Sequence, residues 1–425
     1  MPGPLAGLKV IELCHVMAGP TCGLMLADMG ADVIKLEKIP GGDDTRRMVP
    51  PKIGDETAAF LMMNRNKRGI AVDLKHADGK RVLWRLLETA DVVTENYRRG
   101  FMERMGFGYE ALRRHNKRLI YCAVSGFGRT GPYADRGGYD LIAQGMSGLM
   151  SVTGEGPGRP PVKVGAPVAD ITAGILAAMG ILAALEARHR TGEGQMVDTS
   201  LFEAAIVHTY WQSAIALATG VAPGPMGSAH PLNAPYQAFA TRDGWITVGA
   251  ANQTNWLRLL DVLDAPALRA DERFATGAGR MRHLHDLEAA LNVEFRQRTS
   301  AEWLELLERA GIPAGPVFDV KQMHTNEQTR ARAMVVETEH SALGTVATIG
   351  LPVKFSATPG GIARGAPIYG EHTREVLREH GFGDGEIDAM ARAGAIHVGG
   401  VEVAAEFAIR LVEACQESST GIDCQ

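Results

Sequence analysis

The first part of the chain alternates short apolar runs rich in β-branched residues with helix-like segments, and this alternation constrains the fold more than any other feature. Leu8 to Leu13 is such a run, a helical pattern that ends at Gly30 follows it, and Asp32 to Glu37 is the next run. Further strands are predicted at Gly69 to Leu74, Asp91 to Glu95 and Leu119 to Ser125, with a helix at Gly79 to Thr89. Strands that are connected through helices build a parallel sheet. The sequence therefore predicts an α/β fold whose sheet extends past residue 125.

A second, smaller domain is predicted after the proline- and glycine-rich stretch from Ala222 to Pro235. Such a stretch is typical of a domain boundary because Pro and Gly interrupt regular structure. Beyond it we expect strands at Tyr236 to Thr241 and Trp245 to Gly249, and helices at Trp256 to Leu263, His285 to Arg298 and Thr299 to Ala310. Strands followed by a run of helices are typical of an α+β domain.

Net charge and cysteine spacing narrow the class of protein. The 425 residues carry a formal net charge of −5, which argues against a nucleic-acid partner held by a broad basic surface. The five cysteines form no CxxC pair, so we expect a reducing, cytoplasmic location. No signal peptide is predicted at the N-terminus. The most apolar segment, Ile171 to Ala187, is predicted to be a buried core helix, so no membrane partner is expected.

Three motif-like segments lack the spacing that their chemistry needs. Gly19 and Gly23 do not form the GxGxxG fingerprint that lets a dinucleotide approach the backbone. Ser125 lacks the preceding glycine of a GxSxG nucleophile turn. His283 and His285 would face different sides of a helix and cannot form a metal-binding pair at positions i and i+4. We therefore expect no nicotinamide or flavin cofactor and no metal.

Basic residues are concentrated at two places on this net-acidic chain. Asn64 to Arg68 reads NRNKR, and Tyr97 to Arg118 contains seven Lys and Arg residues against two Glu. Such clusters suit a phosphorylated small ligand, because Arg binds phosphate through two parallel hydrogen bonds. They also suit a solvated helix face, and charge spacing alone leaves the two alternatives open.

Asp170 stands out among the acidic residues because it follows Pro167 and directly precedes the long apolar segment. Asp is a favoured N-cap residue, so capping of this helix is the first prediction for it. The positive end of the helix macrodipole also favours an ionised carboxylate there, by about 0.3–1 kcal/mol. An ionised carboxylate is available as a nucleophile, so the two roles are compatible.

Many short segments of the chain, taken together, resemble those of one family. They include LAGLKVIEL, MAGPTCGLMLADMGADVIKLEKIPGGDDTR, NRNKRGIAVDLK, ENYRRG, GGYDLIAQGMSG, PVADITAG, TGEGQMVDTSLFEA and YGEHTREVLREHGF, and they span residues 5–395. The chain is similar to the class III CoA-transferases, the formyl-CoA and carnitine CoA-transferase family. The resemblance implies a homodimer of interlocked rings, in which each chain forms a Rossmann-like large domain with a parallel sheet and a smaller α+β domain.

On this resemblance the chain divides into four parts. Residues 1–220 are expected to form the large Rossmann-like CoA-binding domain, and residues 221–330 the small α+β domain. Residues 331–396 are expected to return to the large domain, and residues 397–425 are a C-terminal tail without assignment. Within that tail, Glu402 to Ala414 has an amphipathic pattern that is typical of a short helix.

The resemblance also implies roles for individual residues. Asp170 matches the family's nucleophile, whose carboxylate attacks the acyl-CoA thioester to give an aspartyl anhydride and then an aspartyl-CoA thioester. CoA thioesters are thus implied as substrates, with no tightly bound cofactor. Lys38 stands where several relatives have Arg, so a bidentate phosphate contact is lost there. The positions that match the family's CoA-binding residues are His15, Ala18, Lys38, Val72, Lys75, Asn96, Tyr97 and Arg104.

Two departures from the family pattern limit the substrates. Met17 replaces the Gln of the formyl- and oxalyl-handling members, and the segment from Gly224 to Gln237 lacks their run of consecutive glycines. The sequence is more similar to members that use succinyl-CoA as donor and a dicarboxylic acid as acceptor. The 2-methylacyl-CoA racemase is an alternative, but Tyr139 stands where that enzyme has its basic His, and a Tyr with a pKa near ~10 is a poor base. A non-catalytic CoA-binding protein, which would not need Asp170, is the remaining alternative.

Overall fold

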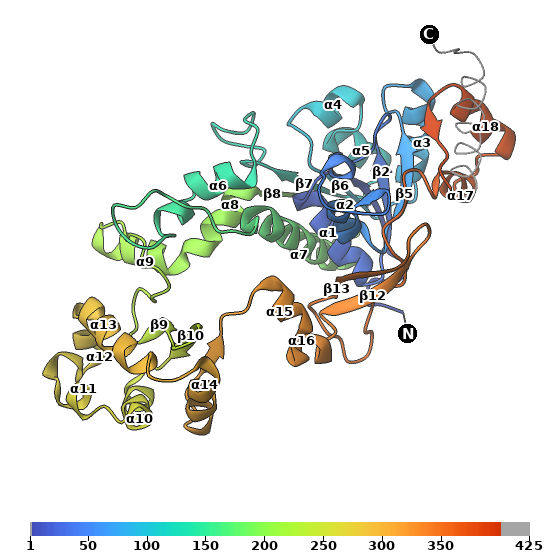
Figure 1. The fold of residues 1–425 in the computed structure, drawn as a ribbon. Helices are drawn as coiled ribbons and strands as arrows, with labels where there is room; N and C mark the ends of the chain where they lie inside the picture. The colour runs from blue at the N-terminus through green and yellow to red at the C-terminus, as the bar shows by residue number, and fades with distance from the viewer. Residues whose placement is uncertain (1, 401–425) are drawn as a thin grey trace, which may run out of the picture. The chain divides into compact units, whose positions relative to one another are not determined.

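The structure is a computed structural model of the chain, and it describes residues 2–400. These residues form two compact units, each of which can be followed by colour in Figure 1. The first unit contains the described parts of Met1–Ser147, Gly165–Val207 and Glu327–Gln425, and the second contains Gly148–Val164 and His208–Asn326. The chain therefore leaves the first unit twice and returns to it each time.

The loop Gly148–Val164 differs from the sequence-based division, which placed it in the large domain. It packs within the second unit, where the Gly227 N–H donates a hydrogen bond to the Gly154 carbonyl (2.8 Å). Sequence alone could not show this, because a proline- and glycine-rich loop carries no periodic pattern that specifies a partner. The predicted tail helix at Glu402 to Ala414 lies outside the described residues.

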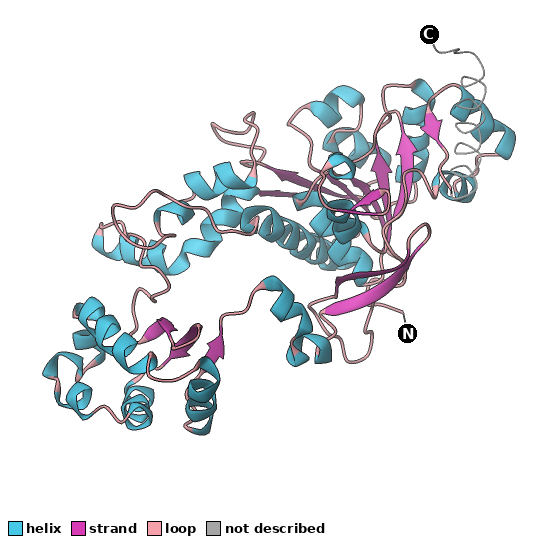
Figure 2. Cartoon of the chain, viewed as in Figure 1, coloured by secondary structure: helices cyan, strands magenta, loops and turns pink. Residues whose placement is uncertain are grey.

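The first unit is built on a seven-stranded sheet, and the pairs β12–β13 and β3–β4 are separate two-stranded sheets of the same unit; all strands are magenta in Figure 2. Neighbouring strands pair in parallel, except that β14 pairs antiparallel with β5. The prediction of an α/β fold with a mostly parallel sheet is confirmed. The strands in spatial order are β14 (Ile396–His397), β5 (Arg68–Val72), β2 (Asp32–Glu37), β1 (Lys9–Leu13), β6 (Val92–Glu95), β7 (Ile120–Ser125) and β8 (Met196–Ser200).

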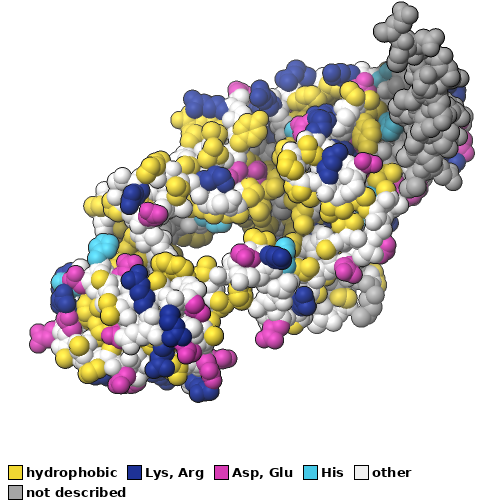
Figure 3. Space-filling view, in the orientation of Figure 1, with side chains coloured by type: hydrophobic (Ala, Val, Ile, Leu, Met, Phe, Trp, Pro, Cys, Tyr) yellow, Lys and Arg dark blue, Asp and Glu magenta, His cyan; other side chains and the backbone are white. Residues whose placement is uncertain are grey.

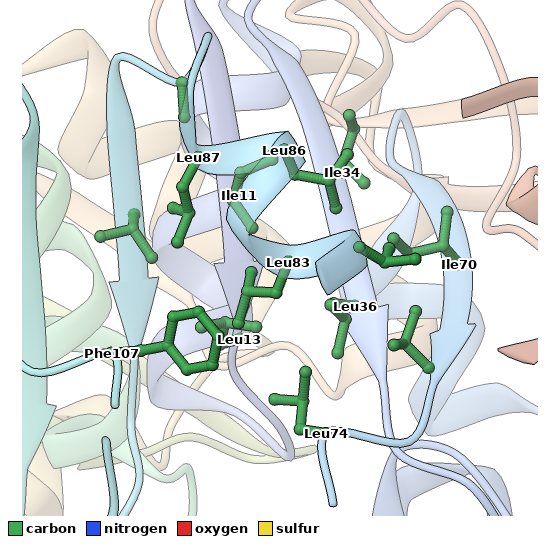
Figure 4. Packing of buried hydrophobic residues seen from close by; sticks show 14 of the residues in the cluster. Ile11, Leu13, Ile34, Leu36, Ile70, Leu74, Leu83, Leu86, Leu87 and Phe107 are labelled. Carbon is green, nitrogen blue, oxygen red and sulfur yellow. The ribbon is translucent and has the colours of Figure 1, made fainter. Parts of the chain in front are cut away.

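Helices cover both faces of this sheet, which is why its central strands are continuous apolar runs. On one face, the leucines of α3 (Ala77–Leu87) pack against Ile11 of β1 and Ile34 of β2, as Figure 4 shows. On the other face, α1 (Ala18–Asp28) and α7 (Val168–Thr191) bury Val10 and Val33, the alternate residues of the same strands.

The helix α7 is the long apolar segment that was predicted from Ile171, and one of its faces packs against α1. A Cβ on Gly174 would lie 2.5 Å from the Ala18 carbonyl oxygen, so the two helices can approach this closely only because residue 174 is glycine. A different stripe of α7, formed by Ile171, Ile175 and Met179, is exposed. By length and composition alone, α7 is also apolar enough to cross a membrane.

Shorter elements complete the first unit. They are β3 (Lys52–Ile53), β4 (Glu56–Thr57), α2 (Ala58–Asn64), α4 (Phe101–Met105), α5 (Tyr109–His115), α6 (Asp140–Met146), α8 (Leu201–Ile206), α16 (Glu327–Ala331), β12 (Val335–His340), β13 (Gly344–Ile349), α17 (Thr373–Glu379) and α18 (Asp384–Arg392).

The second unit has its own hydrophobic core, in which Phe239, Trp256, Phe295 and Trp303 are buried. Its sheet is antiparallel, with β10 between β9 and β11. Its elements are α9 (Tyr210–Thr219), β9 (Tyr236–Ala240), β10 (Trp245–Gly249), α10 (Gln253–Leu263), α11 (Pro266–Ala270), α12 (Gly277–Arg282), α13 (Leu284–Phe295), α14 (Ser300–Arg309), β11 (Ala314–Pro316) and α15 (Val320–Thr325).

Candidate active site

The strand order of the first unit places a crevice at the carboxyl ends of β1 and β6. From β1 the chain continues to β2 on one side, whereas β6 and β7 lie on the other side of β1. Loops that leave neighbouring strands in opposite directions leave a gap, and ligands of parallel α/β sheets bind at such a point. The residues that follow these two strands, from His15 to Ala18 and from Asn96 to Arg99, line one pocket of about 380 Å³.

This pocket brings together six of the nine residues for which sequence analysis predicted a role: Asp170, His15, Ala18, Asn96, Tyr97 and Arg104. Val72 does not line it and is fully buried at the end of β5. Lys75 does not line it either; its backbone N–H donates to the Asp73 carboxylate (2.9 Å). The roles of Val72 and Lys75 toward CoA remain predictions.

Lys38 lies beside the pocket rather than in its lining. Its ammonium is 2.7 Å from one carboxylate oxygen of Asp44, and the other oxygen of Asp44 is 3.6 Å from Nδ1 of His15. Asp44 therefore connects Lys38 to a residue of the pocket wall. The role of Lys38 toward CoA also remains a prediction.

The side chain of Asn96 binds the backbone of His15 at both of its polar atoms. Its amide oxygen accepts from the His15 N–H (3.0 Å), and its amide nitrogen donates to the His15 carbonyl (2.8 Å). The His15 and Tyr97 rings lie 5.7 Å apart, and Tyr97 also packs on Phe101 at 4.4 Å. Burial lowers the pKa of His15 and so favours its neutral ring. These rings form an apolar wall, and Asn96 fixes the backbone behind it.

Four arginines, Arg98, Arg99, Arg104 and Arg136, form the basic part of the pocket lining. Figure 3 shows dark blue Lys and Arg side chains along the edge of this unit where α4 lies in Figure 1. Because guanidinium groups match the geometry of phosphate oxygens, this part of the pocket fits a phosphorylated ligand. Sequence analysis missed Arg136, although the loop that carries it follows the carboxyl end of β7, and that position was the available signal.

The other basic cluster, Asn64 to Arg68, is engaged by protein partners. Arg65 pairs with Asp28 (2.6 Å), Lys67 with Glu12 (2.9 Å) and Arg68 with Asp32 (2.6 Å). All three basic residues are buried. A buried charge needs an opposite charge close by, so this cluster joins β5 to its neighbours and is neither a solvated helix face nor a free phosphate site.

Asp170 lies in the first turn of α7, which begins at Val168 after Pro167. The N-cap prediction is therefore wrong, because Asp170 is the third residue of the helix. Asp140 of α6 performs the capping instead: its Oδ1 accepts from the Ala169 N–H (2.8 Å). The carboxylate of Asp170 lines the pocket and is not needed as the cap.

The surroundings of Asp170 raise its pKa to about 6. Burial is the larger cause, and repulsion from the nearby carboxylate of Asp140 is the second. The macrodipole was expected to favour the ionised form, but these two effects outweigh it. With a pKa of about 6, roughly 90% of the Asp170 side chains are ionised at pH 7. The pocket thus contains a half-buried carboxylate that is still mostly ionised at pH 7.

Metal binding and proton abstraction both depend on which side chains lie together near the pocket. Within residues 2–400, no group of three or more His, Cys, Asp or Glu side chains is arranged to hold a metal ion. Tyr139 lines the pocket next to Asp140, with 77% of its surface exposed. Its phenol, with an ordinary pKa near ~10, is a poor base at neutral pH.

Comparisons with known proteins agree with this geometry. The family model described as CoA-transferase family III matches residues 5–373. The succinate–glutarate CoA-transferase of Agrobacterium fabrum is 41% identical over 88% of this chain and 95% of its own length. The human succinyl-CoA:glutarate CoA-transferase is 36% identical over 88% of this chain and 86% of its own length. A solved CAIB/BAIF family protein from Brucella suis has 38% identity and a TM-score of 0.80, over 89% of this chain and 100% of that one.

Proposed function

The chain belongs to CoA-transferase family III, and from this membership we propose that it moves CoA from succinyl-CoA to a dicarboxylic acid, with Asp170 as the nucleophile. The observation that carries the proposal is the position of Asp170. Among the described residues that line the pocket, it is the only acid, and four arginines line the same pocket. The names of the similar enzymes, which act on succinate, succinyl-CoA and glutarate, support the choice of donor and acceptor class.

In the first half of the proposed reaction, an oxygen of the Asp170 carboxylate attacks the thioester carbonyl of succinyl-CoA. The C–S bond breaks, CoA leaves as a thiolate, and Asp170 and the succinyl group form a mixed anhydride. The thiolate then attacks the aspartyl carbonyl. Succinate leaves, and Asp170 carries CoA as a thioester.

In the second half, the carboxylate of the acceptor attacks the aspartyl carbonyl and expels the CoA thiolate, which gives a second anhydride. The thiolate attacks the acceptor's carbonyl in that anhydride, so the new acyl-CoA forms and the Asp170 carboxylate is regenerated. Every step has a good leaving group, either a thiolate or a carboxylate from an anhydride. No proton transfer is required in any of these steps.

The other pocket residues have separate tasks in this proposal. Arg98, Arg99, Arg104 and Arg136 bind CoA phosphates, and the rings of His15 and Tyr97 pack against its apolar parts. Asp170 is only half-buried, so bound substrates would have to exclude the water that would otherwise hydrolyse an anhydride.

We also infer that the protein is a homodimer of interlocked rings, in a reducing cytoplasm. Exposed apolar side chains support a large shared surface: Ile171, Ile175 and Met179 on α7, and Tyr210, Trp211 and Leu217 on α9. The buried free cysteines Cys14, Cys22 and Cys122 suit a reducing compartment. Sedimentation at nanomolar concentration tests the dimer, and an active monomer would refute it.

The covalent step is tested by trapping. Wild-type enzyme is incubated with succinyl-CoA, quenched with hydroxylamine and digested, and we expect a hydroxamate on the peptide that contains Asp170. Asp170→Asn is the matched control and should carry no adduct and lose nearly all transfer. Transfer by fully characterised Asp170→Asn, with no conversion back to Asp, would refute the nucleophile.

Substrate class is tested by offering glutarate, mesaconate, oxalate and acetate as acceptors and following new CoA esters by mass. We expect transfer to the longer dicarboxylates. A preference for acetate would refute the acceptor class. Exchange of the α-proton of a 2-methylacyl-CoA in D₂O, without any transfer, would favour the racemase instead.

A further inference from the structure

The turn between β1 and α1 contains a strained residue. Val16 has a φ of +67°, in the left-handed region, where a β-branched side chain collides with the backbone. Val16 lines the pocket together with His15 and Met17. Strain of this kind persists only where surrounding contacts hold the backbone in place, and such residues cluster at functional sites. The contacts that hold Val16 therefore matter for the pocket.

Side chains from other parts of the first unit bind the backbone of this turn at successive residues. The Asp43 carboxylate accepts a hydrogen bond from the Val16 N–H (3.1 Å). The preceding residue, His15, is bound through its backbone by the Asn96 side chain. The Lys35 ammonium donates to the carbonyl of Cys14 (2.8 Å). The backbone that leads into Val16 is thus fixed at three consecutive residues, and neither Asp43 nor Lys35 is part of the pocket lining.

Asp43 and Lys35 belong to a network of four buried ionic side chains. Lys35 lies 2.8 Å from Asp43 and 3.0 Å from Glu12, and Lys67 lies 2.9 Å from Glu12. The side chains of Glu12, Lys35 and Lys67 have no exposed surface. Removing four charges from water is unfavourable, and apolar residues of similar size often stabilise a core as well. Stability alone is a weak reason for this network, whereas the holding of a strained turn is a specific one.

We propose that Asp43, itself held by Lys35, is a positioning residue that keeps the strained Val16 turn in place against the substrate pocket. This inference rests on the proposed function, because it assigns a role toward that pocket. The end of the turn, Ala18, lies against Gly174 of α7, the helix that carries Asp170. A turn that relaxes at Val16 would therefore change how the pocket wall faces the nucleophile.

The test is a double-mutant cycle between Asp43 and Val16, measured as kcat/KM for transfer from succinyl-CoA per folded enzyme. Asp43→Ser keeps an N-cap oxygen for the Thr45 N–H, which Asp43 now caps, but is too short to reach Val16. We expect Asp43→Ser to lower kcat/KM at least about tenfold when residue 16 is Val. When residue 16 is Gly, which adopts a positive φ without strain, the loss should shrink to about threefold or less.

Val16→Ala is the matched control, because it also shortens the side chain but keeps the Cβ that opposes a positive φ. In that background the loss caused by Asp43→Ser should stay at about tenfold. A second control, Asp28→Ser, removes another buried carboxylate, which pairs with Arg65 outside the pocket. It should lower the melting temperature and leave kcat/KM per folded enzyme within about twofold.

Equal losses in the wild-type, Val16→Ala and Val16→Gly backgrounds would overturn the proposal. If Asp43→Ser does not fold, Asp43→Asn takes its place in the cycle. In Asp43→Asn, the side chain has one oxygen acceptor, which can accept from the Val16 N–H or from the Lys35 ammonium but not from both. If the loss of kcat/KM caused by Asp43→Asn is smaller in the Val16→Gly background than in wild type, the proposal is supported. If the two losses are equal, the proposal is overturned. Wild-type enzyme without any transfer activity would instead refute the proposed function, and the two failures are therefore distinguishable.

Discussion

The substitution Asp140→Asn isolates one of the two causes that raise the pKa of Asp170. Asn is isosteric with Asp, and its oxygen can still accept from the Ala169 N–H, so the cap of α7 remains. Gln144, which now donates to the other Asp140 oxygen (2.7 Å), can turn its amide to accept from the new NH₂ group. The substitution therefore removes a negative charge and keeps the hydrogen bond that caps α7.

The size of the effect follows from the pKa of Asp170. Its rise from 3.8 to about 6 is close to two pH units, and burial is the larger cause. Repulsion from Asp140 therefore accounts for less than half, which is at most about one pH unit or about 1.4 kcal/mol. In Asp140→Asn, the pKa of Asp170 should fall toward 5 and stay above its ordinary value.

The assay is the pH dependence of kcat/KM for succinyl-CoA between pH 4.5 and 8, because this ratio reports ionisation in the free enzyme. We expect the acidic limb to move to lower pH by up to about one unit in Asp140→Asn. Asp388→Asn, which neutralises an exposed carboxylate on α18, is the control and should leave the limb unchanged. A limb that stays in place or moves to higher pH in Asp140→Asn would refute the electrostatic reasoning.

Three further predictions concern stability and binding. The raised pKa of Asp170 means that the folded state binds the proton more tightly than the unfolded state, so its carboxylate lowers stability as the pH rises from about 4 to 6. In urea unfolding, Asp170→Asn should therefore be up to about 3 kcal/mol more stable than wild type at pH 7 and no more stable below pH 4. Equal differences at both pH values would contradict this. Arg104→Ala should raise the KM for succinyl-CoA by about tenfold at an unchanged melting temperature. Arg113→Ala, on the exposed face of α5, is the control and should leave this KM unchanged. A fall in kcat alone in Arg104→Ala would show that Arg104 does not bind CoA. Gly174→Ala should destabilise the fold by about 1–3 kcal/mol, because the new Cβ would meet the Ala18 carbonyl and Thr21. Gly165→Ala is the control, because a Cβ there has open space. Equal melting temperatures for the two variants would show that α1 and α7 can separate without a loss of stability.

Several features of this protein could be predicted from its sequence because they depend on local pattern. The order of strands and helices between Leu8 and Ser125 specifies a parallel sheet, and five of its seven strands begin and end within two residues of the predicted ones, whereas β8 and β14 were not predicted. Apolar periodicity and strand direction are properties of contiguous segments, so a single sequence contains them.

Only the tertiary structure determined the surroundings of Asp170. Its place in the first turn of α7 looked like a cap, and the cap is Asp140, a residue on another helix. The same holds for the NRNKR segment, whose charges are paired with acidic residues of other strands and helices, and for Asp43, whose carboxylate reaches the Val16 backbone. Each of these contacts depends on the distance between side chains that are far apart in sequence, and that distance is set by the packing of whole elements. Local propensities contain no information about it, so the fold had to be known before the burial, partner and pKa of any of these groups could be assigned.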